Sequence, residues 1–354
     1  MKALTIFQYI KENRQAKSLK IKDLAALLAV DSSLISRYEN GDRLPTKAHL
    51  NLLVSHLDLD FKTAQVFWLK AKIYELLSQE AYIDEAINMV QEEYGNYGGF
   101  VRDELSSDLK ALIKSLDQMK ANLNALRHLD SFRIHEALHL EYTFESNKIE
   151  GNTLTLNETD LVINEGLTIS GKSMREHLEA INHQEAIAFI KDLAKPNYVL
   201  KERDLLQIHH LILRGIYPEE AGKYRKVQVM IKGSSHVPPG PYLVAKQMED
   251  LFIWYNTNRN TSHPVVLAAE MHERLVTIHP FIDGNGRTSR LIMNLILMQH
   301  GFVIANLKGD YGSRTAYYQA LEKCQTTANK DDFIQLIVNT EKDCLDRYLS
   351  ILKA

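Results

Sequence analysis

Apolar residues recur at the spacing of an α-helix along nearly the whole 354-residue chain, and runs in which apolar and polar residues alternate are rare. Glycine, proline and asparagine interrupt the helical pattern at intervals. The clearest alternating run covers residues 227–232 and is followed by Gly233 and Ser234, which are typical of a turn. The pattern therefore predicts an all-α fold with one small β-hairpin.

Changes in the helical pattern divide the chain into three parts. Residues 1–60 contain short helical segments separated by tight turns, whereas residues 61–130 show longer helical periodicity with few breakers. Residues 131–350 hold most of the motifs described below. We expect a small N-terminal domain, a helical connector and a catalytic domain, in that order.

The composition is that of a soluble globular protein, with 45% hydrophobic and 25% charged residues. No stretch has the features of a secretion signal or reaches the roughly 18 uncharged apolar residues that a membrane helix needs. Cys324 and Cys344 are too few for a disulfide framework or a thiolate metal site. We therefore expect a cytoplasmic protein without a membrane segment, and the net charge of −3 provides no general attraction to nucleic acid.

A loop of alternating glycines lies between two helical patterns near the end of the chain. Pro264 can open a helix that ends near His279, and a second helix, apolar on most sides, begins around Arg287. Residues 283–286, Asp-Gly-Asn-Gly, connect the two. Glycines permit left-handed backbone angles, so that N–H groups can converge ahead of a helix N-terminus. The pattern predicts a phosphate-binding loop.

Residues beside this loop carry the groups that phosphate chemistry requires. Asp283 can bind Mg²⁺ together with phosphate oxygens, while Arg287 and Arg290 lie one helical turn apart and can reach the same anion. His279 is positioned as a general base. His272 belongs to the apolar face of the preceding helix and is interpreted as a core histidine.

Residues 279–290, His-Pro-Phe-Ile-Asp-Gly-Asn-Gly-Arg-Thr-Ser-Arg, resemble the signature of the Fic family. The resemblance implies transfer of AMP from ATP to a Tyr, Ser or Thr hydroxyl of a target protein. It implies that His279 is the base, that Phe281 anchors the loop and that Asp283 binds Mg²⁺. The triphosphate would be bound by Gly284, Asn285, Gly286, Arg287 and Arg290.

Residues 222–239 begin with Gly-Lys-Tyr-Arg and end with Pro-Pro, which resembles the Fic flap that positions nucleotide and target. On this interpretation Ile231, Gly233 and Ser234 contact the nucleotide, and the hairpin offers its edge to an extended segment of the target. The alternative is a hairpin that only covers the core. A later segment resembles the part of the family that closes the adenine side of the pocket, and its candidate contacts are Tyr317, Tyr318 and Gln325.

A helix expected near residues 133–150 ends in a Ser-x-x-x-Glu-Gly pattern formed by Ser146, Glu150 and Gly151. The pattern resembles the inhibitory motif of Fic proteins. It implies that Glu150 pairs with Arg290 and occupies the guanidinium that a γ-phosphate needs. The alternative is an ordinary helix end with an exposed glutamate.

Residues 24–45 predict two short helices joined by a tight turn, an arrangement that resembles a repressor-type helix-turn-helix domain. The second helix would offer Ser32, Ser33, Ser36 and Arg37 to DNA. Residues 1–60 contain nine basic and seven acidic side chains, so attraction to phosphate is modest and we expect DNA binding to require a homodimer. The alternative is a protein-interaction module.

Three functions are compatible with these motifs. The first is a protein adenylyltransferase that Glu150 inhibits, with ATP and Mg²⁺. The second is a DNA-binding regulator whose Fic domain only senses ATP. The third is a hydrolase that removes AMP from a modified protein, with Glu150 orienting a water molecule. His279 favours an enzyme, because a sensor needs no base.

Overall fold

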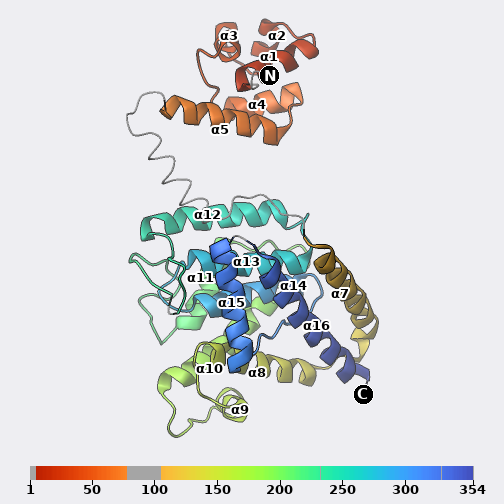
Figure 1. Ribbon diagram of the computed structural model, residues 1–354, viewed down its shortest axis with the longest axis vertical. Helices are drawn as coiled ribbons and strands as arrows, with labels where there is room; N and C mark the ends of the chain where they lie inside the picture. The colour runs from red at the N-terminus through yellow and green to blue at the C-terminus, as the bar shows by residue number, and fades with distance from the viewer. Residues whose placement is uncertain (1–4, 78–104, 232, 328, 354) are drawn as a thin grey trace. The chain divides into compact units, whose positions relative to one another are not determined.

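The computed structural model describes residues 5–77, 105–231, 233–327 and 329–353. Within these residues the regular structure is helical, which confirms the predicted all-α class (Figure 1). None of the helices in these ranges is long and apolar enough to span a membrane. The chain divides into two compact units, Met1–Gly95 and Asn96–Ala354, and each is described by itself.

The first unit is a small helical domain with its own hydrophobic core. Its core includes Ile10, Leu24, Ile35, Leu53 and Trp68, all buried. Its helices are α1 (Ile6–Ala16), α2 (Ile21–Leu27), α3 (Ser32–Asn40), α4 (Lys47–Leu57) and α5 (Phe61–Leu77).

Helices α2 and α3 pack against each other and form a helix-turn-helix. Asp31 caps α3 by accepting a hydrogen bond from the backbone N–H of Ser33, and Gly41 ends the helix in a left-handed conformation. Behind α3, Arg14 of α1 pairs with Glu39 in a buried, two-point ion pair. This pair fixes the orientation of α3 and leaves Ser32, Ser33 and Arg37 exposed.

The stretch 61–130, expected to be a connector, contributes helices to both units. Trp68 of α5 is buried in the first core and donates its indole N–H to the carbonyl of Pro45 at 2.7 Å. Helix α7 (Ser107–Leu126) instead packs against α16 of the second unit. The remaining residues of this stretch include positions 78–104, which lie outside the described residues.

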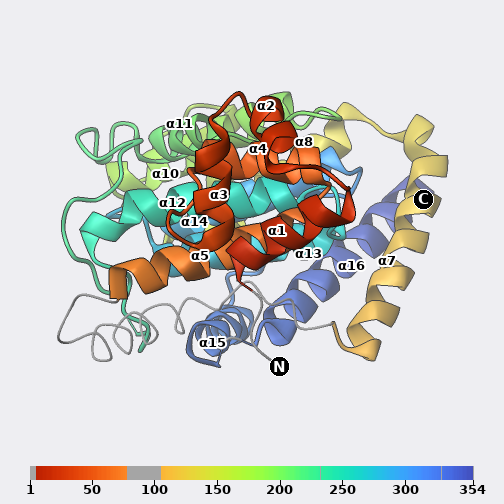
Figure 2. The ribbon, with the colours of Figure 1, turned by 90° about the horizontal axis from the view of Figure 1, so that it is seen from above.

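The second unit is built around two central helices. Figure 1 shows α13 and α14 in the middle, with α12 on one side and α8 and α10 on the other; Figure 2 shows the same helices from above. After α7 and the short 3₁₀ helix η1 (Arg127–Leu129), its helices are α8 (Phe132–Ile149), α9 (Leu156–Asn164), α10 (Met174–Leu193), α11 (Glu202–Leu213), α12 (Pro241–Asn258), α13 (Pro264–Ile278), α14 (Asn285–Gln299), α15 (Tyr311–Thr327) and α16 (Asp331–Lys353).

Helices α13 and α14 are buried on nearly every side, as their apolar sequences require. Helix α13 packs against α12, α15 and α16, whereas α14 packs against α8, α10 and α11. The loop between them, residues 279–284, therefore lies at one end of a rigid helical pair. Rigid packing of this kind holds the side chains of the loop in fixed positions.

The expected β-hairpin at residues 227–232 is not formed by the described residues, so that prediction was wrong. Side chains, and not backbone hydrogen bonds between strands, connect the start of this segment with the residues near Pro238 and Pro239. Gln228 donates to the carbonyl of Pro238 at 2.8 Å, and Arg225 bridges Val227 and Pro239. Pro238 and Pro239 have no N–H to donate, so this part of the chain lacks the donors that a strand needs.

Candidate active site

The loop between α13 and α14 is held by the side chain of Asn285. Its amide accepts a hydrogen bond from the N–H of Phe281 at 3.0 Å and donates to the carbonyl of the same residue at 2.9 Å. Asn285 is 3% exposed, so both functions of its side chain are used inside the loop. Its predicted contact with nucleotide is therefore confined to its backbone.

The start of α14 provides free hydrogen-bond donors. Gly284 adopts a left-handed conformation with φ of 77° and precedes the first turn. The N–H groups of Asn285, Gly286 and Arg287 donate to no other group in the described residues. Together with the helix dipole, three free donors on one turn have the geometry and charge to bind an anion.

His279 lies at the end of α13 in a left-handed conformation, with φ of 49°, which is uncommon for a residue with a side chain. Its Nδ1 lies 3.2 Å from the carbonyl of Val276, so Nδ1 carries the proton and Nε2 is free to accept one. Burial, with a smaller effect of Arg225, lowers the pKa of His279 to about 4. The imidazole is therefore neutral near pH 7.

Arg290 is almost fully buried and binds the end of α8. Its Nε donates to Ser146 Oγ at 3.0 Å, and its Nη2 donates to the Ser146 carbonyl at 2.9 Å and to Glu150 Oε1 at 2.7 Å. Burial opposes the charged form, but Glu150 raises the pKa of Arg290 above its ordinary value. A Cβ added at Gly286 would lie 2.5 Å from Glu150 Oε1, so a larger residue at this position would displace the carboxylate.

Arg287 lies beside two carboxylates. Its Nη1 is 3.2 Å from Glu179 Oε1, without hydrogen-bond geometry, and its Nη2 is 3.5 Å from Asp283 Oδ1. Arg175 of α10 completes the cluster, because it donates to Glu179 at 3.0 Å and to Asp283 Oδ2 at 2.8 Å. The two arginines and the two carboxylates therefore alternate around a ring.

Arg175 and Glu179 were not predicted from the sequence; they lie about a hundred residues before the loop. Their spacing of four on a helical pattern is a local signal, but opposite charges at this spacing are ordinary on a solvated helix face. Glu179 also accepts a hydrogen bond from Asn152, two residues after Glu150. The ring is thus connected to the segment that follows α8.

His209 of α11, which was also not predicted, packs against the loop between α13 and α14. Its ring stacks on Phe281 with centroids 3.6 Å apart. Its Nδ1 accepts from the N–H of Gly222, so Nε2 carries the proton and donates to the carbonyl of Asp283 at 2.9 Å. Burial lowers the pKa of His209 to about 4, and the neutral ring links the loop to the start of the flap.

Arg225 attaches the flap, residues 222–239, to the loop. Its Nε donates to the carbonyl of His279 at 2.8 Å, and its backbone N–H donates to the carbonyl of Pro280 at 2.9 Å. The same guanidinium donates to carbonyls at both ends of the flap, at Val227 and Pro239. Arg225 belongs to the flap pattern in the sequence, but its role in attaching the flap to the loop was not predicted.

Hydrogen bonds hold the tip of the flap to helices α15 and α13. The backbone N–H and the hydroxyl of Ser235 both donate to Glu322 of α15, at 2.9 and 2.7 Å. His236 Nε2 lies 2.9 Å from the carbonyl of Thr277 on α13. The predicted nucleotide contacts Ile231, Gly233 and Ser234 lie at this tip, where the N–H of Ser234 donates to the carbonyl of Ile231.

The three predicted adenine contacts lie in different surroundings. Tyr317 is 2% exposed and its hydroxyl lies 3.0 Å from His272 Nε2, inside the core. Tyr318 is 42% exposed and donates to the carbonyl of Ile149, beside Glu150. Gln325 is buried and donates to Thr277 at 3.3 Å.

The prediction for His272 is confirmed. The side chain is fully buried, and burial lowers its pKa to about 3. A histidine that stays neutral and contacts the Tyr317 hydroxyl and the Phe333 ring is part of the core.

Two family models match this chain. The Fic/DOC family model matches residues 199–297, which include α11, the flap, α13 and the loop. The helix-turn-helix model matches residues 10–62 of the first unit.

Individual relatives agree with these matches. The chain is 36% identical over 243 residues to Protein adenylyltransferase Fic of Drosophila willistoni; the match covers 67% of this chain and 47% of that protein. The chain thus spans about half the length of the curated relatives it matches.

Two crystal structures share the fold. A Fic domain containing signaling protein from Bacteroides thetaiotaomicron is 29% identical, with a TM-score of 0.60, over 68% of this chain and 95% of that one. A Fic family protein from Desulfovibrio desulfuricans is 26% identical, with a TM-score of 0.61, over 70% of this chain and 76% of that one. The chain therefore contains a domain of the Fic/DOC family, preceded by a domain of the helix-turn-helix family.

Proposed function

We propose that this protein transfers AMP from ATP to a Tyr, Ser or Thr hydroxyl of a target protein. One observation carries the proposal: a neutral histidine, His279, with Nε2 free lies at the other end of the loop from three unpartnered N–H groups at the start of α14. A base and an anion site in one short loop are the groups that phosphoryl and nucleotidyl transfer require.

In the proposed reaction His279 Nε2 accepts the proton of the target hydroxyl. The oxygen forms a bond to the α-phosphorus of ATP, and the bond from that phosphorus to the oxygen bridging to the β-phosphate breaks. AMP then remains on the target, and pyrophosphate leaves. The start of α14, with Arg287 and Arg290, would hold the oxygens on which negative charge collects.

Asp283 is a reasonable ligand for Mg²⁺. Its carboxylate is partly exposed at the mouth of the loop, and Mg²⁺ commonly takes one or two carboxylates together with phosphate oxygens. Among the described residues no three acidic, histidine or cysteine side chains are placed to hold a metal ion by themselves, so the phosphates would complete the coordination. When bound, the ion would neutralise charge on the phosphates.

We propose that Glu150 inhibits this reaction. Arg290 is already hydrogen-bonded to Ser146 and Glu150, and its Nη1 is the buried nitrogen left without a partner. A γ-phosphate would have to compete with Glu150 for the same guanidinium. ATP bound without this contact would have its α-phosphorus poorly aligned for attack.

The exposed side chains of the flap suit a protein partner. Val227 is 55% exposed, Met230 is 91% exposed and Val237 is 71% exposed. Exposed apolar side chains carried by one surface segment suit contact with another protein. We place the reaction in the cytoplasm, where ATP is available and the free thiols of Cys324 and Cys344 stay reduced.

Labelled nucleotides test the proposal. The protein is incubated with ATP labelled at the α-phosphate or, separately, at the γ-phosphate, and with a lysate. Transfer of AMP labels protein only in the first case. Protein labelled from the γ-phosphate alone would instead indicate phosphoryl transfer and would contradict the proposal.

We propose DNA binding as a second function, carried by the helix-turn-helix. Helix α3 presents Ser32, Ser33 and Arg37 to solvent, with Ser36 half-buried between them. We expect DNA binding to require a homodimer, because one copy has few basic side chains. The promoter of the protein's own gene is the DNA that we expect it to bind. Arg37→Ala should weaken binding and reduce its dependence on salt, measured by filter binding at several salt concentrations. Affinity that does not change with salt would favour a protein-interaction module.

A further inference from the structure

The end of helix α8 carries side chains on two different faces. Ser146 and Glu150 are four residues apart, and both contact Arg290 of α14. Glu145 and Lys148 are three residues apart and lie on the other face. What contacts Glu145 and Lys148 therefore helps to fix the position of Glu150.

The loop between α14 and α15 meets this second face at Gly309, which is buried. The N–H of Gly309 donates to Glu145 Oε2 at 2.8 Å, and Lys308 Nζ lies 3.5 Å from Glu145 Oε1. A Cβ added at Gly309 would lie 2.8 Å from Lys148 Cβ and 3.0 Å from the carbonyl oxygen of Glu145. These atoms belong to the helix backbone or are bonded to it, so a larger residue would fit only if the loop or the helix moved.

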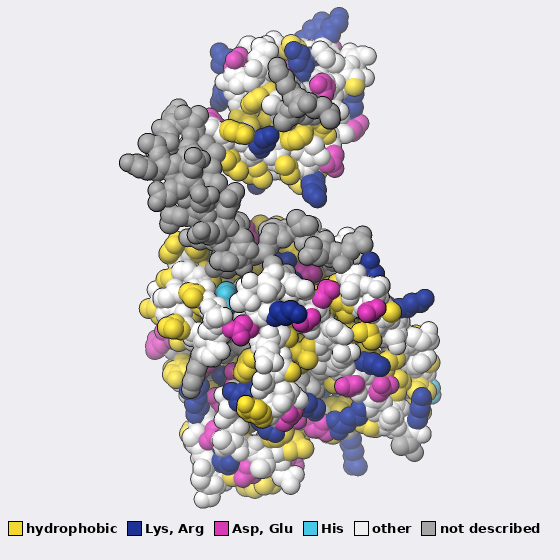
Figure 3. All heavy atoms as spheres, viewed as in Figure 1, with side chains coloured by type: hydrophobic (Ala, Val, Ile, Leu, Met, Phe, Trp, Pro, Cys, Tyr) yellow, Lys and Arg dark blue, Asp and Glu magenta, His cyan; other side chains and the backbone are white. Residues whose placement is uncertain are grey.

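Helix α15, which follows this loop, also contacts the end of α8. The hydroxyl of Tyr318 donates to the carbonyl of Ile149, the residue before Glu150, at 3.4 Å. Helix α15 lies at the front of the second unit in Figure 1, and the same view in Figure 3 shows side chains of this region at the surface. A substitution at an exposed position of α15, such as Gly312, therefore leaves the contacts with α8 in place.

The loop is fixed on both sides of Gly309. Asn294 of α14 is fully buried; it accepts from the N–H of Ala305 at 2.8 Å and donates to the carbonyl of the same residue at 3.3 Å. On the other side, Asp310 caps α15 by accepting from the N–H of Ser313 at 3.0 Å. A larger residue at position 309 would therefore displace the end of α8 more readily than the loop.

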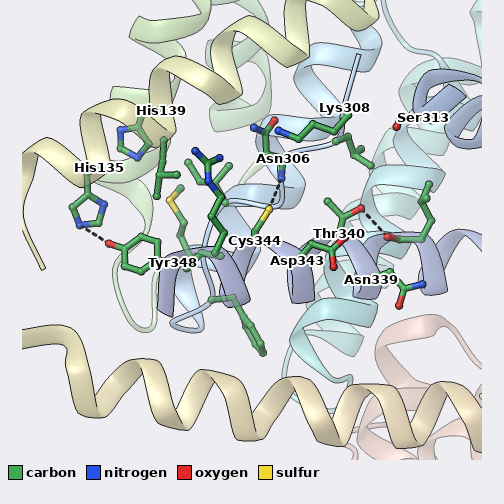
Figure 4. A pocket seen from close by; sticks show the side chains of 18 of the residues that line it. His135, His139, Asn306, Lys308, Ser313, Asn339, Thr340, Asp343, Cys344 and Tyr348 are labelled. Carbon is green, nitrogen blue, oxygen red and sulfur yellow. Dashed lines mark hydrogen bonds between the residues drawn. The ribbon is translucent and has the colours of Figure 1, made fainter. Parts of the chain in front are cut away.

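The close approach of the loop to α8 is confined to the end of the helix. A cavity of about 610 Å³ lies between the earlier part of α8 and α16, lined by Leu138 and His139 on one side and by residues 302–308 on another (Figure 4). Beside this cavity the loop is attached to α16 instead, because the N–H of Asn306 donates to Cys344 Sγ at 3.4 Å (Figure 4). A change in the contact between loop and helix would thus act on the part of α8 that carries Glu150.

We propose that Gly309 and Glu145 are positioning residues that hold Glu150 against Arg290. Since this role rests on the proposed inhibition of AMP transfer by Glu150, it makes that inhibition depend on the loop between α14 and α15. The missing side chain at Gly309 lets the loop approach α8, and its N–H holds Glu145. Both residues act through Glu150 and lie outside the loop between α13 and α14.

Gly309→Ala in the full chain tests the proposal. It should increase the initial rate of self-labelling by α-labelled ATP about three- to tenfold, because the hydrogen bond from Arg290 to Glu150 is weakened but not removed. In the Glu150→Gly background the same substitution should have no further effect, since the carboxylate through which it acts is absent.

Gly312→Ala is the matched control. A Cβ added at Gly312 has Asp310 Oδ1 as its nearest neighbour, at the ordinary distance of 3.5 Å. This variant should label at the wild-type rate. Hydrogen exchange of the backbone amides at the end of α8 gives a readout independent of activity, and it should be faster in Gly309→Ala but not in Gly312→Ala.

Glu145→Ala serves if Gly309→Ala fails to fold, because it removes the acceptor of the Gly309 N–H without adding bulk. It should also increase labelling, whereas Glu145→Gln keeps an oxygen that can accept this N–H and should stay close to the wild type.

The outcomes separate this inference from the proposed inhibition. If Glu150→Gly increases labelling but the folded Gly309→Ala variant, or Glu145→Ala in its place, does not, the positioning role is wrong and the inhibition stands. An equal increase from Gly309→Ala in the Glu150→Gly background would also overturn the positioning role, because the effect would not pass through Glu150. If Glu150→Gly itself changes nothing, the inhibition is wrong and the positioning role falls with it.

Discussion

Glu150 Oε1 accepts a hydrogen bond from Arg290 Nη2 at 2.7 Å, and this contact joins residues 140 positions apart in the chain. Arg290 is 1% exposed, so its charge has few alternative partners in the absence of a phosphate. Whether the Arg290 guanidinium can bind a phosphate therefore depends on the Glu150 carboxylate.

Glu150→Gly should therefore increase self-labelling by α-labelled ATP, roughly 10- to 100-fold, because alignment of the reacting groups is restored. Glu150→Gln keeps the shape but removes the charge, and should give an intermediate increase. Initial rates of labelling, compared at equal protein concentration, measure both effects. Unchanged labelling in the Gly variant would rule out inhibition by this carboxylate.

Replacement of His279 should separate catalysis from binding. Its backbone has a positive φ, which asparagine tolerates better than alanine, so His279→Asn removes the base with little added strain. Labelling should fall by about 10²–10⁴ while ATP affinity is retained. Labelling by gel and ATP binding by calorimetry are the two readouts. A variant that still labels at the wild-type rate would place the base elsewhere.

Arg175 should compete with a metal ion for Asp283. Its guanidinium occupies Oδ2 of that carboxylate at 2.8 Å, so Arg175→Ala should increase the affinity for Mn²⁺ in the presence of a non-hydrolysable ATP analogue. Electron paramagnetic resonance reports free Mn²⁺ directly. As a control, Arg214→Ala removes a similarly exposed ion pair, with Glu185, and should leave the affinity for Mn²⁺ unchanged. Weaker Mn²⁺ binding in Arg175→Ala would mean that this arginine helps to hold the phosphates.

The buried neutral His272 should make stability depend on pH. Its pKa is about 3 in the folded protein, below its ordinary value of 6.5, so the unfolded chain binds more protons between these values. The free energy that neutral His272 contributes to stability is complete above pH 6.5 and is lost as the pH falls toward 3. Between pH 7 and 5 the loss is about 2 kcal/mol.

Urea unfolding of the wild type and of His272→Asn at pH 7 and pH 5 measures this difference. The variant is expected to be less stable at pH 7, because the Tyr317 hydroxyl loses its partner, but to lose less stability between the two pH values. Parallel losses in the two proteins would show that His272 is not the group that titrates.

Local sequence patterns were enough to predict the helical class, the helix-turn-helix and the loop between α13 and α14. These features depend on periodicity, capping residues and glycines within one or two turns of each other. The pairing of Glu150 with Arg290 was also anticipated, but through the resemblance of residues 146–151 and 279–290 to a family and not through any local rule. The role of that pair remains a proposal.

The flap shows where local pattern fails. Alternation at residues 227–232 predicted a strand, yet the described residues are held by Arg225 and Gln228, since Pro238 and Pro239 cannot donate to a ladder. Periodicity reports which faces are apolar, but it does not report whether a partner strand is available.

Helical periodicity, caps and the glycine loop follow from contacts between residues close in sequence, and the sequence by itself determined them. Only the tertiary structure placed Arg175 against Asp283 and His209 beneath Phe281. Such arrangements arise when helices distant in sequence pack together, because packing chooses which distant side chains meet and no periodic pattern records that choice.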